Sequence, residues 1–358
     1  MIASVENTHR ASLRTTLLVV TGLYIAFLIY LVEYLRFNMF QSDVLSYWLE
    51  SQAWRTPFST WWVPGYPLLI ALARWLTADS IGPVVLMCAI SGAGYIVATM
   101  TVYELASARG PVEPRAAALL FAVYPFVGLA YSVYPISDIV AVALILQAVL
   151  RLERRHWNRF ALFAGLALIT HKAAWLFVPP LLLVAFFVHH RRRYVIPLAG
   201  LPLAVWIVAG AFYHHEVLWF VRWGIDNLVK SKTTLPAFDG LIGPFLSPSP
   251  AKVAKGVVVA ATMMVATFLA WRCYLKQAWV GVCIAGAVTV MGVAINSYEI
   301  WAAVRFSKML IVPIVIVSAG TDGTAKMMRT KRLVVTLLLV SMISNVAYGV
   351  YMTRFFSE

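Results

Sequence analysis

Long uncharged apolar runs are the feature that most constrains this chain. A helix that crosses a bilayer needs about 20 mainly apolar residues, because inside lipid every backbone amide must be hydrogen-bonded within its own segment. By that criterion the sequence predicts about eleven spanning helices. They lie near Thr16–Leu35, Ile81–Leu105, Ala116–Ser132, Ile136–Leu150, Phe160–Thr170, Ala173–Val188, Tyr194–Tyr213, Val253–Trp271, Ala278–Ile295, Ala303–Gly320 and Leu333–Tyr351.

The polar residues are too few and too scattered to form a soluble domain. Charged residues make up 12% of the chain and hydrophobic residues 61%, whereas a soluble domain is about a quarter charged. We therefore predict an all-α fold, in which residues 1–358 form a single polytopic transmembrane helical bundle. The polar start MIASVENTHRASLR lacks the apolar core of a cleaved signal, so the first apolar helix is expected to be a retained anchor. Cys88, Cys273 and Cys283 have no metal-ligand or disulfide spacing, and we expect them to be packing residues.

Basic residues predict how the bundle is oriented. The formal charge of +14 comes from short Lys and Arg runs between apolar segments, a pattern typical of cytoplasmic loops, so no nucleic-acid partner is expected. These runs share one side only if Gly65–Thr77 lies along the interface instead of crossing. We thus expect a multi-pass integral membrane protein with a cytoplasmic N-terminus, a first outer loop over 36–80 that contains this interfacial helix, and a second outer loop over 214–252.

The first outer loop carries a candidate catalytic base. Asp43 follows the first predicted span, and Tyr47 lies four positions later, on the same face if the segment is helical. A carboxylate at the membrane boundary can accept a proton from a hydroxyl nucleophile. The alternative is that Asp43 caps a helix.

Aromatic residues follow in the same loop. Trp61, Trp62 and Tyr66 could line an apolar groove for a lipid chain or stack on a sugar ring. The alternative is an aromatic belt at the membrane interface.

Two further outer turns contain ionisable residues. Asp138 begins the helix after the VYPISDIV turn, where it could cap that helix or orient an acceptor. His171 and Lys172 interrupt a long apolar stretch, and ionisable groups in such a position usually face a cavity or a partner. For Lys172 the alternative is that its side chain extends to the outer interface.

A late segment adds two cations. Arg305 and Lys308 are three positions apart on one helix face and could bind a phosphate together, unless Glu299 pairs with one of them. The sequence lacks a Walker A loop, a His-Glu zinc helix, a GxSxG elbow and a GxGxxG turn. No cofactor is indicated; a divalent metal remains open, because one or two carboxylates are a thin ligand set.

In chain order, these pieces resemble the type C (GT-C) glycosyltransferases, polytopic enzymes that take sugars from polyprenyl-phosphate donors, with mannosyltransferase-like members. The resemblance rests on Asp43 after the first span, WWVPGYPLLIAL, YPISD, GLALITHKAAWLFVPPLLL and VRFSKMLIVPIVIV. This chain departs from the family where Ser42 precedes Asp43, since members often have an acidic pair there, and where Lys172 occupies a position that is often Arg.

The resemblance implies an inverting transfer on the outer face of the membrane, here expected to be a bacterial inner membrane. Asp43 would deprotonate an acceptor hydroxyl on a lipid, glycan or protein, and Arg305 with Lys172 or Lys308 would stabilise the departing polyprenyl phosphate. The residues implied to line the substrate site are Tyr47, Trp61, Trp62, Tyr66, Asp138, His171 and Glu299. The alternative function is a transporter or flippase with Lys172, Glu33 and Arg305 along its path, although no repeated halves are visible.

Overall fold

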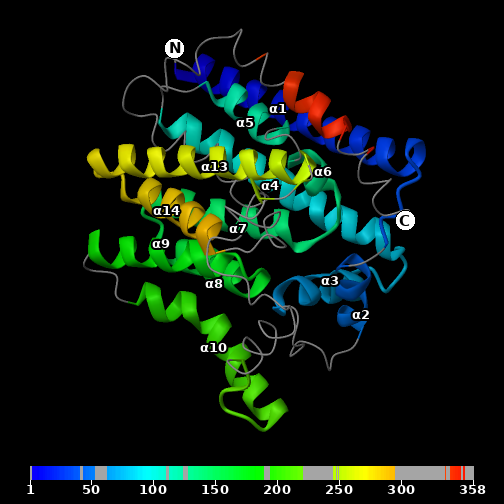
Figure 1. Cartoon of the computed structure of the whole chain (residues 1–358), viewed down its shortest axis with the longest axis vertical. Helices are drawn as coiled ribbons and strands as arrows, with labels where there is room; N and C mark the ends of the chain where they lie inside the picture. The colour runs from blue at the N-terminus through cyan, green and yellow to red at the C-terminus, as the bar shows by residue number, and fades with distance from the viewer. Residues whose placement is uncertain are drawn as a thin grey trace.

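The computed structural model describes residues 2–40, 43–52, 63–109, 113–123, 128–188, 194–220, 245–246, 248, 250–294, 335, 339–347 and 350. In these ranges the regular structure is helical, without strands, as predicted. The helices are α1 Ile2–Ile29, the π-helix η1 Tyr30–Tyr34, α2 Asp43–Gln52, α3 Gly65–Leu76, α4 Pro83–Arg109, α5 Pro114–Val123, α6 Gly128–Val133, α7 Ser137–Glu153, α8 Trp157–Thr170, α9 Ala174–Val188, α10 Val195–His214, α13 Pro250–Leu275 and α14 Trp279–Ala294 (Figure 1).

Helix α7 forms the centre of the bundle (Figure 1). Nearly all of its residues are buried, as expected of a helix that is apolar on every side. Helices α4 and α8 both pack against it. Gly94 allows α4 to approach closely, since a Cβ there would lie 3.3 Å from the backbone of Val140. The Gln147 amide donates to the hydroxyl of Thr101 at 2.6 Å, a polar link between α7 and α4 of the kind that joins membrane helices.

Three helices in the described part of the chain are long and apolar enough to cross a membrane. These segments are Ala11–Tyr34, Pro83–Ala108 and Val195–His214. In the most apolar window of the first and the third, only 28% and 22% of the residues are buried. Leu18 and Phe212, for example, expose 73% and 77% of their surface. Outward-facing apolar residues on such long helices are suited to lipid contact, which agrees with a membrane protein.

The predicted spans coincide with observed helices up to residue 294, with one difference. Ala116–Ser132 was expected to be one span, but its described residues form two shorter helices, α5 and α6, with residues 124–127 outside the described ranges. Ala303–Gly320 also lies outside these ranges. Leu333–Tyr351 is described only in part, and its residues 339–347 are helical. The count of about eleven spans therefore stays a prediction.

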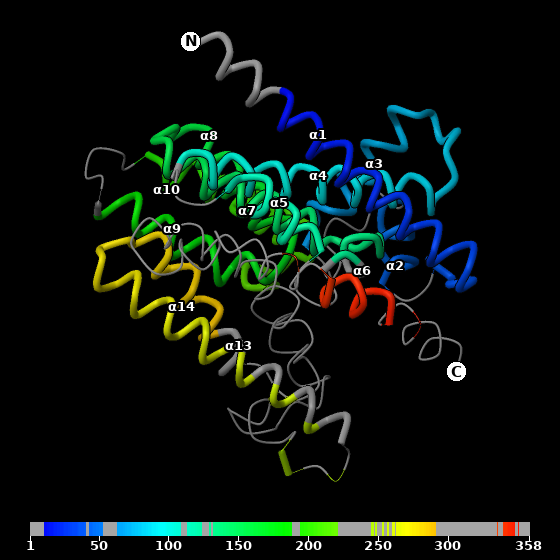
Figure 2. Tube along the Cα trace, turned by 90° about the horizontal axis from the view of Figure 1, so that it is seen from above, coloured from blue at the N-terminus to red at the C-terminus, as the bar shows by residue number. Residues whose placement is uncertain are grey.

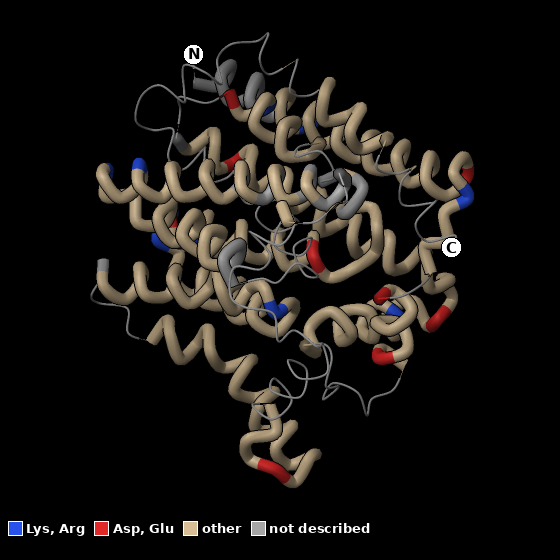
Figure 3. Tube along the Cα trace, in the orientation of Figure 1, with Lys and Arg blue, Asp and Glu red and all other residues tan. Residues whose placement is uncertain are grey.

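Helices outside the centre pack on α8 and α9, which themselves contact α7. Figure 2 shows α13 and α14 running side by side, with α14 next to α9, and α10 packs against α8. Figure 3 shows that many of the Lys, Arg, Asp and Glu residues lie near helix ends and turns, and the middles of the long helices α4 and α10 are uncharged. This distribution is the one expected when helix centres lie in hydrocarbon.

The first predicted outer loop contains α2 and α3. The helix expected over Gly65–Thr77 is present as α3, which ends at Leu76. Its Tyr66 and Ile70 are fully buried, whereas Trp75 exposes 75% of its surface. Helix α3 contacts α2, α4 and α8. The helix is thus confirmed, and its location at the membrane interface stays a prediction.

Candidate functional site

Helices α2 and α3, the start of α7 and the turn between α8 and α9 meet at one end of the bundle. Helices α7 and α8 are consecutive, tightly packed and joined by a short turn, so the first residues of α7 lie beside the last residues of α8. The arginine-rich turn around Arg151–Arg155 is at the other end of both helices. The same end of the bundle thus holds Ser137, Asp138 and His171.

Gly65 allows α3 to dock at this end. An added Cβ would lie 2.6 Å from the carbonyl oxygen of Ile169 and 2.9 Å from the hydroxyl of Thr170. Only a residue without a side chain can place the first turn of α3 this close to the last turn of α8. The Pro-Gly-Tyr-Pro stretch therefore contributes a packing contact that brings Tyr66 to the site.

Tyr47 links α2 to α7. Its hydroxyl lies 2.7 Å from Oγ of Ser137, and its ring meets that of Tyr66 edge to face, with centroids 4.8 Å apart. Tyr47 exposes 3% of its surface and Tyr66 none. A buried phenol needs a hydrogen-bond partner, and Ser137 supplies one.

Two carboxylates, Asp138 and Asp43, lie close enough to Tyr47 to act on the pKa of its hydroxyl. Burial raises the pKa of Tyr47 well above its ordinary value; the bond to Ser137 lowers it in part, and the nearby carboxylates of Asp138 and Asp43 raise it by smaller amounts. The phenol therefore keeps its proton at physiological pH, where it remains available as a donor.

Asp43, the candidate base, is the first residue of α2 and is half-buried. Because the segment is helical, Asp43 and Tyr47 share a face, as the spacing of four predicted. A carboxylate in the first turn also interacts favourably with the helix dipole. The structure thus fits both readings of Asp43, as an N-terminal helix residue and as a base.

Asp138, at the start of α7, pairs with His171, at the end of α8. Asp138 Oδ1 lies 3.2 Å from His171 Nε2, and the two side chains expose 3% and 17% of their surface. The other ring nitrogen, Nδ1, accepts the backbone N–H of Ala173 at 3.0 Å. Since Nδ1 accepts, the proton of the neutral ring is on Nε2, which donates to Asp138.

Lys172 lies in the turn that follows His171. It is half-buried and lies two residues before Ala174, the first residue of α9. The indole N–H of Trp175 donates to the carbonyl of Leu168 at 2.8 Å and ties the start of α9 to the end of α8. The candidate cation is thus held on a tight turn beside the pair of Asp138 and His171.

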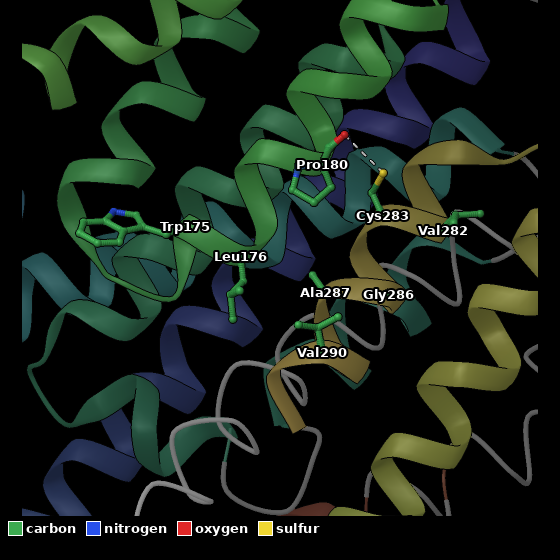
Figure 4. A pocket seen from close by; sticks show the side chains of 8 residues that line it. All are labelled: Trp175, Leu176, Pro180, Val282, Cys283, Gly286, Ala287 and Val290. Atoms are coloured by element: carbon green, nitrogen blue, oxygen red, sulfur yellow. Dashed lines mark hydrogen bonds between the residues drawn. The ribbon is translucent and has the colours of Figure 1, made fainter. Parts of the chain in front are cut away.

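A mostly apolar cavity of about 360 Å³ opens between α9 and α14. It begins at Trp175, close after Lys172 in the chain, and extends past Cys283, whose thiol donates to the Pro180 carbonyl at 3.4 Å (Figure 4). The residues that line it are Trp175, Leu176, Pro180, Val282, Cys283, Gly286, Ala287 and Val290.

Sequence reasoning missed Ser137 as a partner of Tyr47. The only available signal was its position beside Asp138 at a helix start, which says nothing about a residue 90 positions away. The sequence-predicted site residues that the structure brings together are Asp43, Tyr47, Tyr66, Asp138 and His171, with Lys172 next to His171 in the chain. Those that lie outside the described residues are Trp61, Trp62, Glu299, Arg305 and Lys308.

Within the described ranges, His, Cys, Asp and Glu side chains form no group of three that could hold a metal ion. No family model, curated protein or solved structure matches the chain.

Proposed function

We propose that this protein is a membrane-embedded, inverting glycosyltransferase of the hexosyl- or pentosyltransferase type, which moves a sugar from a polyprenyl-phosphate donor to an acceptor hydroxyl. One observation carries the proposal. The helix that begins with the candidate base, Asp43, is joined through Tyr47 and Ser137 to Asp138, and through His171 to the turn that bears Lys172. A proton acceptor and a cation are thereby held at one end of the bundle, as transfer with a phosphate leaving group requires.

In the proposed reaction, Asp43 takes the proton of the acceptor hydroxyl while that oxygen forms a bond to the anomeric carbon. The bond from this carbon to the phosphate oxygen lies on the opposite face of the sugar ring and breaks at the same time, which inverts the configuration at the anomeric carbon. Lys172 stabilises the charge that grows on the phosphate by a charge-assisted hydrogen bond. Arg305 and Lys308 are proposed to act on the same phosphate.

The cavity between α9 and α14 is the proposed seat of the polyprenyl chain. Its lining is mainly apolar, and it starts at Trp175, in the first turn of α9 and three residues after Lys172. A lipid whose phosphate is bound at Lys172 would thus place its apolar tail in this cavity. Tyr66, Trp61 and Trp62 remain proposed contacts for the sugar or the first isoprene units.

The proposed topology has about eleven spans with the site on the outer face and the N-terminus in the cytoplasm of a bacterium. The separation of charge supports it. The arginine-rich turn between α7 and α8 lies at the opposite end of these helices from Asp138 and His171. Positive residues collect on the cytoplasmic side of membrane proteins, which leaves the candidate site on the other side.

The position of Glu33 argues against the alternative function, a transporter or flippase. Glu33 was expected along an internal path, but its side chain exposes 66% of its surface and pairs with Arg36 at 3.4 Å. An exposed ion pair of this kind does not line a route through the bundle.

The decisive test compares Asp43→Asn with the purified wild-type protein on a panel of polyprenyl-phosphate sugars, with a membrane extract as the source of acceptor hydroxyls and release of polyprenyl phosphate as the readout. We expect the wild type to consume at least one donor and Asp43→Asn to lose transfer by about 10²-fold or more, since the substitution removes a general base. Asp79→Asn is a matched control, because Asp79 is an exposed carboxylate paired with Arg74 at the surface. Unchanged transfer by Asp43→Asn would remove Asp43 as the base, and no donor consumption by the wild type would contradict the proposed function.

A further inference from the structure

Both ring nitrogens of His171 are engaged by the protein itself. Nδ1 accepts the N–H of Ala173 at 3.0 Å, and Nε2 lies 3.2 Å from the buried carboxylate of Asp138. A histidine that carries protons in catalysis needs one nitrogen directed at the reacting group. His171 has instead the arrangement of a structural clamp, with its tautomer fixed by its two partners.

The clamp acts on the turn that contains Lys172. His171 ends α8 with extended backbone (φ −155°, ψ 139°). Its carbonyl accepts the N–H of Ala174, and the Lys172 carbonyl accepts that of Trp175, both at 3.0 Å, which starts α9. The imidazole adds a third bond, from a side chain to the N–H two residues on, in the way that Asn and Asp side chains close turns. Asp138 anchors that imidazole to α7.

We propose that His171 is a positioning residue, which Asp138 and the Ala173 amide hold in place so that the turn presents Lys172 to the phosphate of the donor lipid. The inference rests on the proposed function for the identity of the ligand, and on the geometry alone for the clamp. It replaces the expectation that His171 itself contacts substrate. The chemical class that Lys172 recognises is a phosphate ester at the head of an isoprenoid chain.

The first experiment measures steady-state kinetics of the donor for His171→Ala, His171→Asn, Lys172→Met and His171→Ala/Lys172→Met. A mobile turn weakens the contact of Lys172 with the phosphate, both in the bound donor and in the transition state, so we expect His171→Ala to lower kcat/KM for the donor about tenfold. Since His171 acts through Lys172, adding His171→Ala to Lys172→Met should change little, the non-additivity of residues that share one role. His171→Asn should recover much of the loss, because its amide oxygen can accept the Ala173 N–H.

The second experiment reads the clamp without activity, by amide hydrogen exchange of the peptide over residues 168–176. Exchange should be about tenfold or more faster in His171→Ala and close to wild type in His171→Asn, because the imidazole protects the Ala173 amide. His156→Ala is the matched control, since His156 precedes α8 at its other end, is exposed, and its side chain makes no capping hydrogen bond.

These two experiments separate the two ideas. Unchanged exchange in His171→Ala overturns the clamp, whatever the protein transfers. Faster exchange in a protein that consumes no polyprenyl-phosphate sugar keeps the clamp and removes the proposed function. An unchanged kcat/KM for the donor in His171→Ala, or additive effects with Lys172→Met, overturns the positioning role.

Discussion

The hydroxyl of Tyr47 lies 2.7 Å from Oγ of Ser137, and this contact joins α2, in the predicted first outer loop, to the central helix α7. Both groups are buried, so neither can exchange its partner for water without cost. The bond therefore fixes the helix that begins with Asp43 relative to the start of α7, where Asp138 pairs with His171.

Tyr47→Phe is predicted to lower the free energy of unfolding by about 1 to 2 kcal/mol, because it leaves the buried Ser137 hydroxyl without this bond. Thermal unfolding in detergent would measure the loss. Adding Ser137→Ala should restore part of it, since a pair of apolar groups is cheaper than one unsatisfied hydroxyl. Fully additive effects of the two substitutions would show that the two hydroxyls are not coupled.

Gly65→Ala is predicted to destabilise the docking of α3 on α8. The new Cβ would meet the backbone carbonyl of Ile169 at 2.6 Å, and backbone cannot turn aside as a side chain can. We expect a loss of about 1 to 3 kcal/mol, the usual cost of overpacking, together with impaired transfer.

Gly200→Ala is the control for this prediction. Gly200 lies within α10 with no heavy atom within 4 Å of a built Cβ, so the substitution should be neutral or slightly stabilising through its helix propensity. Equal stability of Gly65→Ala and Gly200→Ala in thermal unfolding would contradict the close contact of α3 and α8.

Much of the fold could be predicted from the lengths of the apolar runs. These runs place helices such as α4, α8 and α10 close to their observed bounds, because length and hydrophobicity decide whether a segment can be a buried helix. The exception at Ala116–Ser132 shows the limit, since the hydropathy of the run does not reveal where a helix ends inside it.

The site could be predicted only in part. The sequence identified Asp43 and Asp138 by their positions in predicted outer turns, and His171 by its interruption of a long apolar stretch. It could not identify which of them touch, because the pair of Asp138 and His171 depends on the antiparallel packing of α7 and α8. The role of Gly65 was equally hidden, since its contact is with a backbone atom more than a hundred residues away.

Gly286→Leu is predicted to reduce donor binding without harming the fold. Gly286 lines the cavity between α9 and α14, and a Cβ there meets nothing within 4 Å, so a leucine has room to enter. If the polyprenyl chain occupies this cavity, the donor KM should rise by about tenfold while thermal stability is kept or increased, because the new side chain buries apolar surface.

Gly22→Leu provides the matched control. Gly22 is exposed on α1 and its built Cβ also meets nothing within 4 Å, so this variant adds the same side chain away from the cavity. Donor KM values that are equal in the two variants would place the lipid chain elsewhere.

Ser59→Cys is predicted to react with a membrane-impermeant maleimide added to the outside of intact cells. Ser59 belongs to the predicted first outer loop, in the sequence between α2 and α3, and the proposed orientation puts this loop on the same side as Asp138 and His171. The native thiols should be removed first as Cys88→Ala, Cys273→Ala and Cys283→Ala, since Cys283 is half-buried and lines the cavity between α9 and α14. Arg155→Cys in the same background is the opposite control, because the turn between α7 and α8 is at the arginine-rich end and should react only after permeabilisation. The opposite result is that Ser59→Cys reacts only after permeabilisation and Arg155→Cys reacts from outside. That result would reverse the orientation and place the candidate site on the cytoplasmic side, where a lipid-linked donor would have to be supplied from the inner leaflet.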